Sequence, residues 1–187
     1  MASFLRLERK EWGDIFLKAQ THEARNVALM GLAEMKATWP LLKRLATEIN
    51  NWEHSDRLAD LIAKAHEVDA ALVYPTLAKW NGSTNAWLRR LSITSLFYYS
   101  RSRKQQPKIA HVLPLVENLL DDRHPYVTKA VGWTLREAGN VYPKETLIFL
   151  KRHICRLAPV AFSYATEKLD RKSKEELKQL RSSRSCG

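Results

Sequence analysis

The sequence is poor in the residues that mark several classes of protein. Two cysteines, Cys155 and Cys186, are too few for a framework of several disulfides or for a cysteine-built zinc site. Six glycines and seven prolines in 187 residues argue against a loop-rich or collagen-like chain and fit long helices. No apolar run reaches the ~20 residues needed to span a bilayer, and the polar N-terminus is unlike a signal peptide. We therefore expect a soluble cytoplasmic protein, nucleoid-associated if it is bacterial, with no membrane partner.

Positive charge, by contrast, is in excess. The chain carries 31 Lys and Arg against 20 Asp and Glu, a formal net charge of +11. Because 45% of the residues are hydrophobic, the chain can bury a core and is not a disordered basic tail. The default partner for such a surface is the phosphate backbone of a nucleic acid.

The hydrophobic pattern is helical along the whole chain. Apolar residues recur at spacings of three and four, as in Leu41, Leu42, Leu45 and Ile49, and no strand-like alternation is present. Short breaks leave about ten helices of roughly 12–18 residues. Antiparallel pairs of helices repeating about every 40 residues predict an all-α, right-handed solenoid of HEAT-like repeats. One internal match supports the repeat, since residues 87–91 align with residues 126–130 at an offset of 39.

Two regions follow from this pattern. Residues 1–169 are expected to form one HEAT-like helical-repeat domain, since no break is long enough to be a domain linker. Residues 170–187 hold six Lys and Arg against three acids and are expected to be a basic, frayed C-terminal tail.

The first segment that could carry chemistry begins at Asn50 and Asn51. An Asn caps a helix start well, which places Trp52 and Asp56 one turn apart on the same face. The helix dipole favours the charged form of Asp56 there, and an aromatic ring beside a carboxylate attracts a cation. The alternative is a core Trp followed by a solvated Asp.

The second segment runs from Lys79 to Arg90. Two tryptophans flank a turn around Gly82, and Arg89 and Arg90 follow Trp87 at a helix start. Adjacent arginines beside aromatic rings suit a phosphate clamp. The alternative is a solvated arginine pair with the Trp packed between repeats.

The third segment, residues 126–137, places Lys129, Trp133 and Arg136 on one helical stripe. A basic and aromatic stripe suits a nucleic-acid backbone with a stacked ring. The alternative is a core Trp133 with the two basic residues at its rim. Gly132 costs a helix ~1 kcal/mol relative to Ala, which predicts that something approaches closely there.

Together the three segments resemble the HEAT-like-repeat DNA alkylation-repair family, the alkylpurine DNA glycosylase D type, from about Ala24 to Leu169. The family pattern is Trp-x-x-x-Asp, then Asn-x-Trp-Leu-x-Arg, then Lys-Ala-x-Gly-Trp-x-Leu-Arg-Glu. This chain has these motifs at residues 52–56, 85–90 and 129–137.

The resemblance implies hydrolytic removal of N3- or N7-alkylated purines from duplex DNA, with no metal and no cofactor. It implies catalytic roles for Trp52, Asp56 and Trp133, and a phosphate contact from Arg90. Further DNA contacts are expected from four neighbouring residues: Trp87, Arg89, Lys129 and Arg136. We expect a monomer.

Only 51 residues precede Trp52, about one helical repeat fewer than the family usually has, so we expect a weaker grip on DNA. Two alternatives to a glycosylase stay open. One is a non-catalytic DNA-binding solenoid. The other is a protein-interaction scaffold, which explains the fold but neither the charge nor the Trp–Asp pair.

Overall fold

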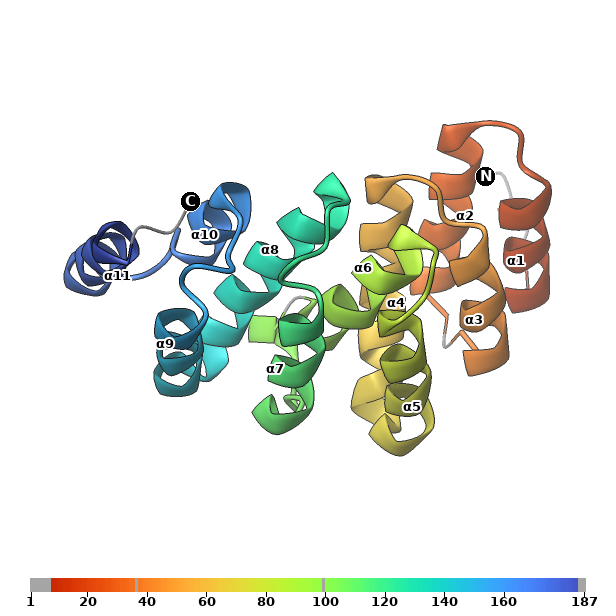
Figure 1. The fold of residues 1–187 in the computed structure, drawn as a ribbon. Coiled ribbons are helices and arrows are strands. Elements are labelled where there is room, and N and C mark those ends of the chain that lie inside the picture. The colour runs from red at the N-terminus through yellow and green to blue at the C-terminus, as the bar shows by residue number, and fades with distance from the viewer. Residues whose placement is uncertain (1–7, 36, 99, 185–187) are drawn as a thin grey trace.

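Figure 1 shows the computed structural model, which describes residues 8–35, 37–98 and 100–184. Within these ranges every regular element is helical, which confirms the all-α prediction. The elements are α1 (Arg9–Lys18), α2 (His22–Ala33), α3 (Trp39–Thr47), α4 (Trp52–Val68), α5 (Ala70–Asn81), α6 (Ala86–Phe97), the 3₁₀ turn η1 (Ser100–Ser102), α7 (Ile109–Asn118), α8 (Pro125–Val141), α9 (Pro143–Arg152), α10 (Pro159–Ala165) and α11 (Arg171–Ser183).

The helix starts carry the expected signals. A side-chain oxygen of the residue before the helix accepts a hydrogen bond from a first-turn backbone N–H in α2, α4, α5, α6 and α11. Such a cap satisfies one of the donors that a helix start leaves open. In α8, α9 and α10 a proline stands in the first turn, where its missing N–H costs nothing. The capping residues are Thr21, Asn51, Asp69, Asn85 and Asp170.

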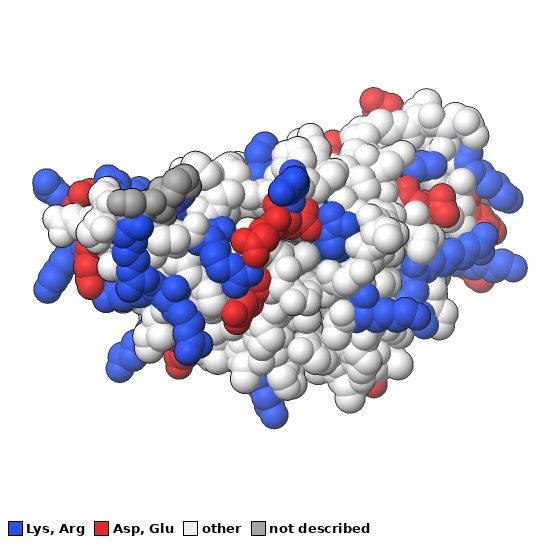
Figure 2. Space-filling view, viewed as in Figure 1, with Lys and Arg blue, Asp and Glu red and all other residues white. Residues whose placement is uncertain are grey.

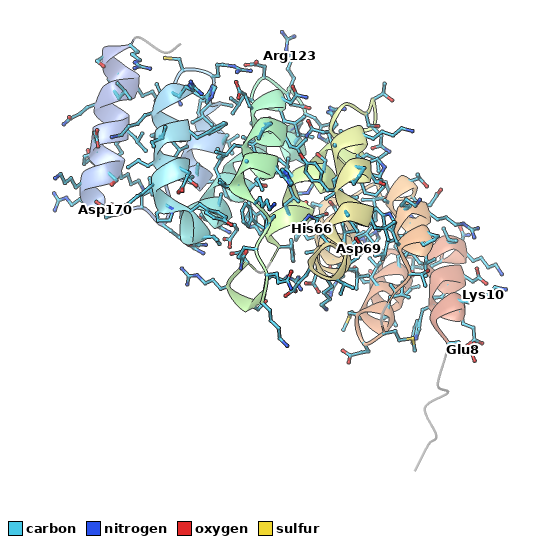
Figure 3. The ribbon with its side chains drawn as sticks, turned by 90° about the horizontal axis from the view of Figure 1, so that it is seen from below. Glu8, Lys10, His66, Asp69, Arg123 and Asp170 are labelled. Carbon is cyan, nitrogen blue, oxygen red and sulfur yellow. The ribbon has the colours of Figure 1, made fainter. Side chains whose placement is uncertain are left out.

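The helices form two layers of a solenoid. The even-numbered helices form the inner layer, in which α2 packs on α4, α4 on α6, α6 on α8 and α8 on α10. The odd-numbered helices form the outer layer, with α1, α3 and α5 each packed against the inner helix that follows. The array runs from α1 at one end to α11 at the other (Figure 1). Seen from below, Glu8 and Lys10 lie at one end and Asp170 at the other (Figure 3).

The internal repeat is confirmed by the packing. The inner helices α6 and α8 begin at Ala86 and Pro125, so residues 87 and 126 hold equivalent positions. The rings of Trp87 and Tyr126 lie against each other at a centroid distance of 5.1 Å. Equivalent aromatic residues of successive repeats therefore contact one another along the inner layer.

The segment after Asp170 differs from its prediction. Residues 171–183 form α11, which contacts α9, instead of fraying. Leu177 is fully buried, and the Arg181 guanidinium donates to the Leu157 carbonyl at 2.8 Å and lies over the Phe162 ring. Leu177 and Leu180, three residues apart, both pack against the core, although charged residues surround them in the sequence. No helix in the described part of the chain is both long and apolar enough to cross a membrane.

Candidate nucleic-acid site on the inner layer

The start of α4 places the first two candidate residues. The Asn51 side chain accepts a hydrogen bond from the His54 backbone N–H at 2.9 Å, so α4 begins at Trp52. Asp56 then follows one turn later. Trp52 is 52% exposed and is not a core residue, contrary to the alternative reading. The Trp–Asp pair therefore faces solvent from the inner layer.

A network beside this pair ties α4 to α2. The Glu53 carboxylate lies 2.7 Å from His22 Nε2 and accepts a 2.7 Å hydrogen bond from the Asn26 side chain. The hydrogen bond to His22, with further contributions from Arg57, holds the pKa of Glu53 below its usual value. These contacts fix the orientation of the helix start that carries Trp52.

One pocket, of about 320 Å³, gathers residues from four successive inner helices. Trp52 and Asp56 come from α4, Arg90 from α6, and Lys129 and Trp133 from α8. Five of the eight predicted site residues therefore meet around one hollow. Two further aromatic residues, Tyr126 and Tyr164, complete its lining.

Arg90 is the link that holds the pocket together. Its guanidinium contacts Asp56 Oδ1 at 2.5 Å through Nη2 and donates to the Tyr126 carbonyl at 2.8 Å through Nη1. Arg90 is only 8% exposed, whereas the Asp56 side chain is 26% exposed, so the ion pair has a buried arginine and a carboxylate that solvent can reach. In this structure the guanidinium binds the Asp56 carboxylate, and the phosphate contact expected of Arg90 stays a prediction. Arg90 joins α4, α6 and α8 and orients Asp56 within the pocket.

The aromatic rings of the pocket have different surroundings. The Lys129 ammonium lies 5.6 Å from the centroid of the Tyr126 ring. The Trp133 ring packs beside the Tyr98 ring, with 5.3 Å between their centroids. The Arg136 guanidinium lies 5.9 Å from the centroid of the Trp133 ring. These separations are within the range of cation–π attraction. The rings thus already stabilise positive charge in the free protein.

Gly132 explains how α10 reaches the pocket. A Cβ at this position would lie 2.4 Å from the Ala161 carbonyl oxygen and 2.8 Å from Tyr164 Cβ. Only glycine therefore permits the observed approach of α8 and α10, which confirms the close contact predicted at this residue. Sequence reasoning missed Tyr164, since no motif marks it. Tyr126 carried a signal, because it opens the repeated segment, but it was not named as a site residue.

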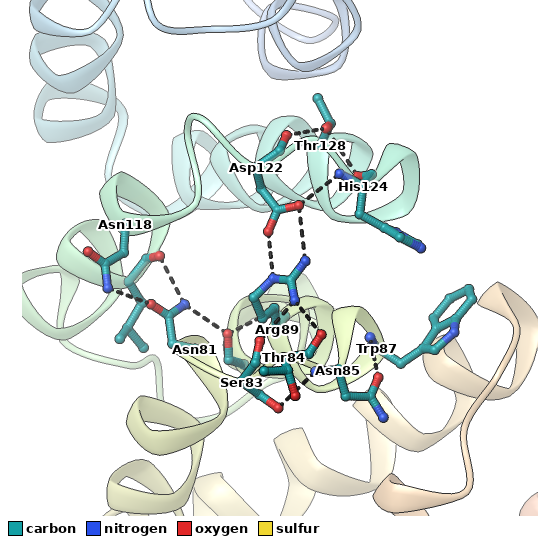
Figure 4. A network of polar contacts seen from close by, with 12 residues as sticks. Asn81, Ser83, Thr84, Asn85, Trp87, Arg89, Asn118, Asp122, His124 and Thr128 are labelled. Atoms are coloured by element: carbon teal, nitrogen blue, oxygen red, sulfur yellow. Dashed lines mark hydrogen bonds and ion pairs between the residues drawn. The ribbon is translucent and has the colours of Figure 1, made fainter.

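Arg89 lies outside the pocket, although it is adjacent to Arg90. Figure 4 shows its guanidinium held by Asp122 at 2.6 and 3.3 Å and by the carbonyls of Ser83 and Thr84 at 2.8 and 3.0 Å. Burial acts to raise the pKa of Asp122, but hydrogen bonds from Arg89 and the His124 amide overcome this effect and lower it. Arg89 thus ties α6 to the α7–α8 turn, and its expected DNA contact stays a prediction.

Trp87 and Arg136 also make contacts within the protein. The Trp87 ring packs against Tyr126 and His124, between α6 and α8. Arg136 is paired with Glu137 at 3.2 Å and with Glu167 at 2.7 Å. Neither residue lines the pocket around Asp56, although Arg136 lies over one of its rings. These positions do not test the DNA contacts expected of Trp87 and Arg136, which stay predictions.

The surplus positive charge is unevenly distributed. On the face seen in Figure 2, Lys and Arg gather towards the two ends of the array, and acidic side chains gather near its middle. In the pocket, Arg90 and Lys129 face a single carboxylate, Asp56. Lys129 is exposed and has no acidic partner among the described residues. It is the pocket cation that remains available to a phosphate.

No group of three or more potential metal ligands occurs among residues 8–35, 37–98 and 100–184.

Comparisons with known proteins agree with this architecture. The chain matches no curated protein. It is similar in structure to smu.31 from Streptococcus mutans UA159, with a TM-score of 0.60 and 19% identity over 93% of this chain and 81% of the other. AlkD2 from Streptococcus mutans gives a TM-score of 0.59 and 20% identity over 93% and 79%. A family model described as DNA alkylation repair enzyme matches residues 4–169. Because that match covers most of the sequence, the chain belongs to the DNA alkylation repair enzyme family.

Proposed function

We propose that this protein is a DNA N-glycosylase, which hydrolyses the glycosidic bond of N3- or N7-alkylated purines in duplex DNA. The observation that carries the proposal is the convergence of Trp52, Asp56 and Trp133 on one open pocket. Membership of a DNA alkylation repair family supplies the substrate class.

The lesion itself provides much of the activation. Alkylation at N3 or N7 gives the purine a positive charge, so the base leaves as a neutral molecule when the glycosidic bond breaks. The electron pair of that bond goes to the base, and the sugar acquires oxocarbenium character. Water then adds its hydroxyl to the anomeric carbon and releases a proton, which leaves an abasic site.

Asp56 is suited to the charge that develops. A fixed carboxylate near the sugar stabilises the oxocarbenium ion and can orient the attacking water. Trp52 and Trp133 can lie against the cationic base or sugar, each contributing ~0.5–2 kcal/mol. Lys129 is placed to contact a neighbouring phosphate, which positions the strand without reading its sequence.

Arg90 has two roles in this proposal. In the free protein it orients Asp56 through the 2.5 Å contact. A contact between Arg90 and a DNA phosphate, which the family resemblance implies, would take a donor away from Asp56 and leave the carboxylate charge unshared. Binding of DNA would then increase the negative charge available to the sugar.

The test is release of methylated purines from methylated duplex DNA under enzyme excess. Asp56→Asn removes the fixed charge and is expected to reduce the rate by about 100-fold or more, the usual effect of losing one electrostatic contact to a transition state. Asp121→Asn is the matched control, since Asp121 is exposed and pairs with Arg156 away from the pocket. Equal rates for the two variants would refute the catalytic role of Asp56.

The Arg90–Asp56 pair favours a second candidate, a DNA-binding protein without catalysis. In this case the arginine keeps the carboxylate neutralised when DNA is bound. Wild-type protein would then bind duplex DNA, with log K falling linearly against log[salt], but would release no base even in large excess.

A further inference from the structure

The pocket rings fall into two groups. Tyr126 is covered by the Lys129 ammonium, and Trp133 is flanked by Tyr98 and Arg136. Within the described ranges, Trp52 and Tyr164 are the pocket rings that neither pack against another aromatic ring nor have a cation over them. They are also the most exposed of the four, at 52% and 36%. Two uncovered rings are thus available to a ligand.

These two rings come from the two outermost helices that line the pocket. Trp52 comes from α4 and Tyr164 from α10, the first and last of the four inner helices that line the hollow. Asp56 lies on α4 with Trp52, and Arg90 and Trp133 lie on α6 and α8, between α4 and α10. A flat cationic group in this hollow would have a ring from α4, a ring from α10 and a carboxylate at its side.

The position of Tyr164 is set by a residue on another helix. Gly132 allows the backbone of α10 to approach so closely that any Cβ would meet the Ala161 carbonyl at 2.4 Å. Cation–π attraction requires a ring within about 6 Å of the charge, so a small displacement of α10 weakens it. Glycine at this position therefore keeps the Tyr164 ring within reach of the pocket.

We propose that Tyr164 is a lesion-contacting residue, whose ring selects cationic purine adducts over neutral bases, and that Gly132 is the positioning residue for it. The inference rests on the proposed function, because it takes the Asp56 pocket as the site of the alkylated base. Selectivity for charge follows from the chemistry, since a neutral purine gains stacking from the ring but no cation–π attraction.

The experiment compares the affinity for two duplexes. One contains a single 7-methylguanine with a 2′-fluoro sugar, which resists hydrolysis, and the other contains guanine at that position. Tyr164→Leu keeps apolar bulk but removes the ring, and is expected to lower the preference for the methylated duplex by about 2- to 30-fold. Tyr164→Phe keeps the ring and should retain the preference. Affinity for the unmodified duplex should fall less in Tyr164→Leu, because a neutral purine loses only stacking, and should not change in Tyr164→Phe.

Matched controls separate this effect from general damage. Ile148→Ala removes an exposed apolar residue on α9, outside the pocket, and should leave the preference intact. Gly132→Ala should lower it, whereas Gly139→Ala in the same helix should not, because a Cβ there meets only Thr146 Cγ2 at 3.9 Å. Thermal unfolding of each variant shows that it is folded.

The outcomes distinguish the two proposals. A wild-type protein that prefers the methylated duplex but releases no base would refute the glycosylase and leave the role of Tyr164 standing if Tyr164→Leu removes the preference. An unchanged preference in Tyr164→Leu, equal losses in Leu and Phe variants, or no preference in the wild type would each overturn the role of Tyr164, whatever the rate of base release.

Discussion

The two glycines of α8 allow the packing of the pocket wall to be measured. Gly132→Ala and Gly139→Ala make the same chemical change in the same helix. Both gain up to about 1 kcal/mol of stability, because Ala has a higher helix propensity than Gly. Only the first change creates a collision, with contacts of 2.4 Å and 2.8 Å to the backbone of Ala161 and 2.8 Å to Tyr164 Cβ.

The collision has a predictable cost. Non-bonded carbon and oxygen atoms in proteins are not repulsive at separations of roughly 3.4 Å or more. The added Cβ would lie 2.4 Å from the Ala161 carbonyl oxygen, so α10 must move by about 1 Å. Backbone atoms cannot rotate out of the way as a side chain can, and overpacking of this kind costs about 1–3 kcal/mol. Gly139→Ala should therefore be stabilised, and Gly132→Ala should be less stable than Gly139→Ala by about 1–3 kcal/mol.

Thermal unfolding followed by far-UV circular dichroism tests this difference. For a protein of this size, 1 kcal/mol corresponds to about 2–4 °C in Tm, so the two variants should differ by roughly 2–12 °C. A Gly132→Ala variant that melts at or above the temperature of Gly139→Ala would show that α10 does not need glycine beneath it. The account of how Tyr164 reaches the pocket would then be wrong.

Three further predictions follow from the described contacts. Lys129→Ala should weaken DNA binding similarly for all sequences and reduce the slope of log K against log[salt] by about 0.9, which binding titrations at several salt concentrations would reveal. Arg89→Ala leaves a buried carboxylate unpaired and should cost about 3 kcal/mol in urea unfolding; a cost near zero would contradict its structural role. Burial lowers the pKa values of His54, His66 and His153, so the folded chain binds fewer protons than the unfolded chain once the pH falls below about 6.5. Stability should therefore fall as the pH drops below about 6.5 and be constant above about pH 7, and a rise on acidification would refute the assignment.

Local signals in the sequence predicted the inner layer well. Asn51 and Asn85 cap the helices that carry Trp52 and Arg90, so short-range hydrogen bonding fixes where these helices begin. The side of the helix on which each residue lies then follows from the helical period. Prediction from spacing succeeds for Trp52 and Asp56 because both lie on one helix.

Contacts between helices were beyond such reasoning. Arg89 and Arg90 are neighbours in the sequence, yet Arg89 pairs with Asp122 in the α7–α8 turn and Arg90 pairs with Asp56 on α4. Tyr164 belongs to the pocket only because α10 docks on Gly132, which lies 32 residues earlier in the chain. These placements depend on long-range packing, which periodicity does not encode.

The docking of α11 is a similar case. Its charged residues suggested fraying, but the burial of Leu177 outweighs them. A single apolar stripe can decide whether such a segment folds, since the charged side chains remain in water.

The Arg90 link has a mechanical consequence. One guanidinium joins three successive inner helices, and in a solenoid each repeat otherwise touches only its neighbours. Local opening can begin at either end of such an array and travel inward one repeat at a time. The Arg90 contacts lie at the centre, where opening from α1 must break them before it reaches α8. The residues that define the pocket thus also oppose the spread of local unfolding along the array. Amide hydrogen exchange should therefore be slowest in α6 and the first half of α8.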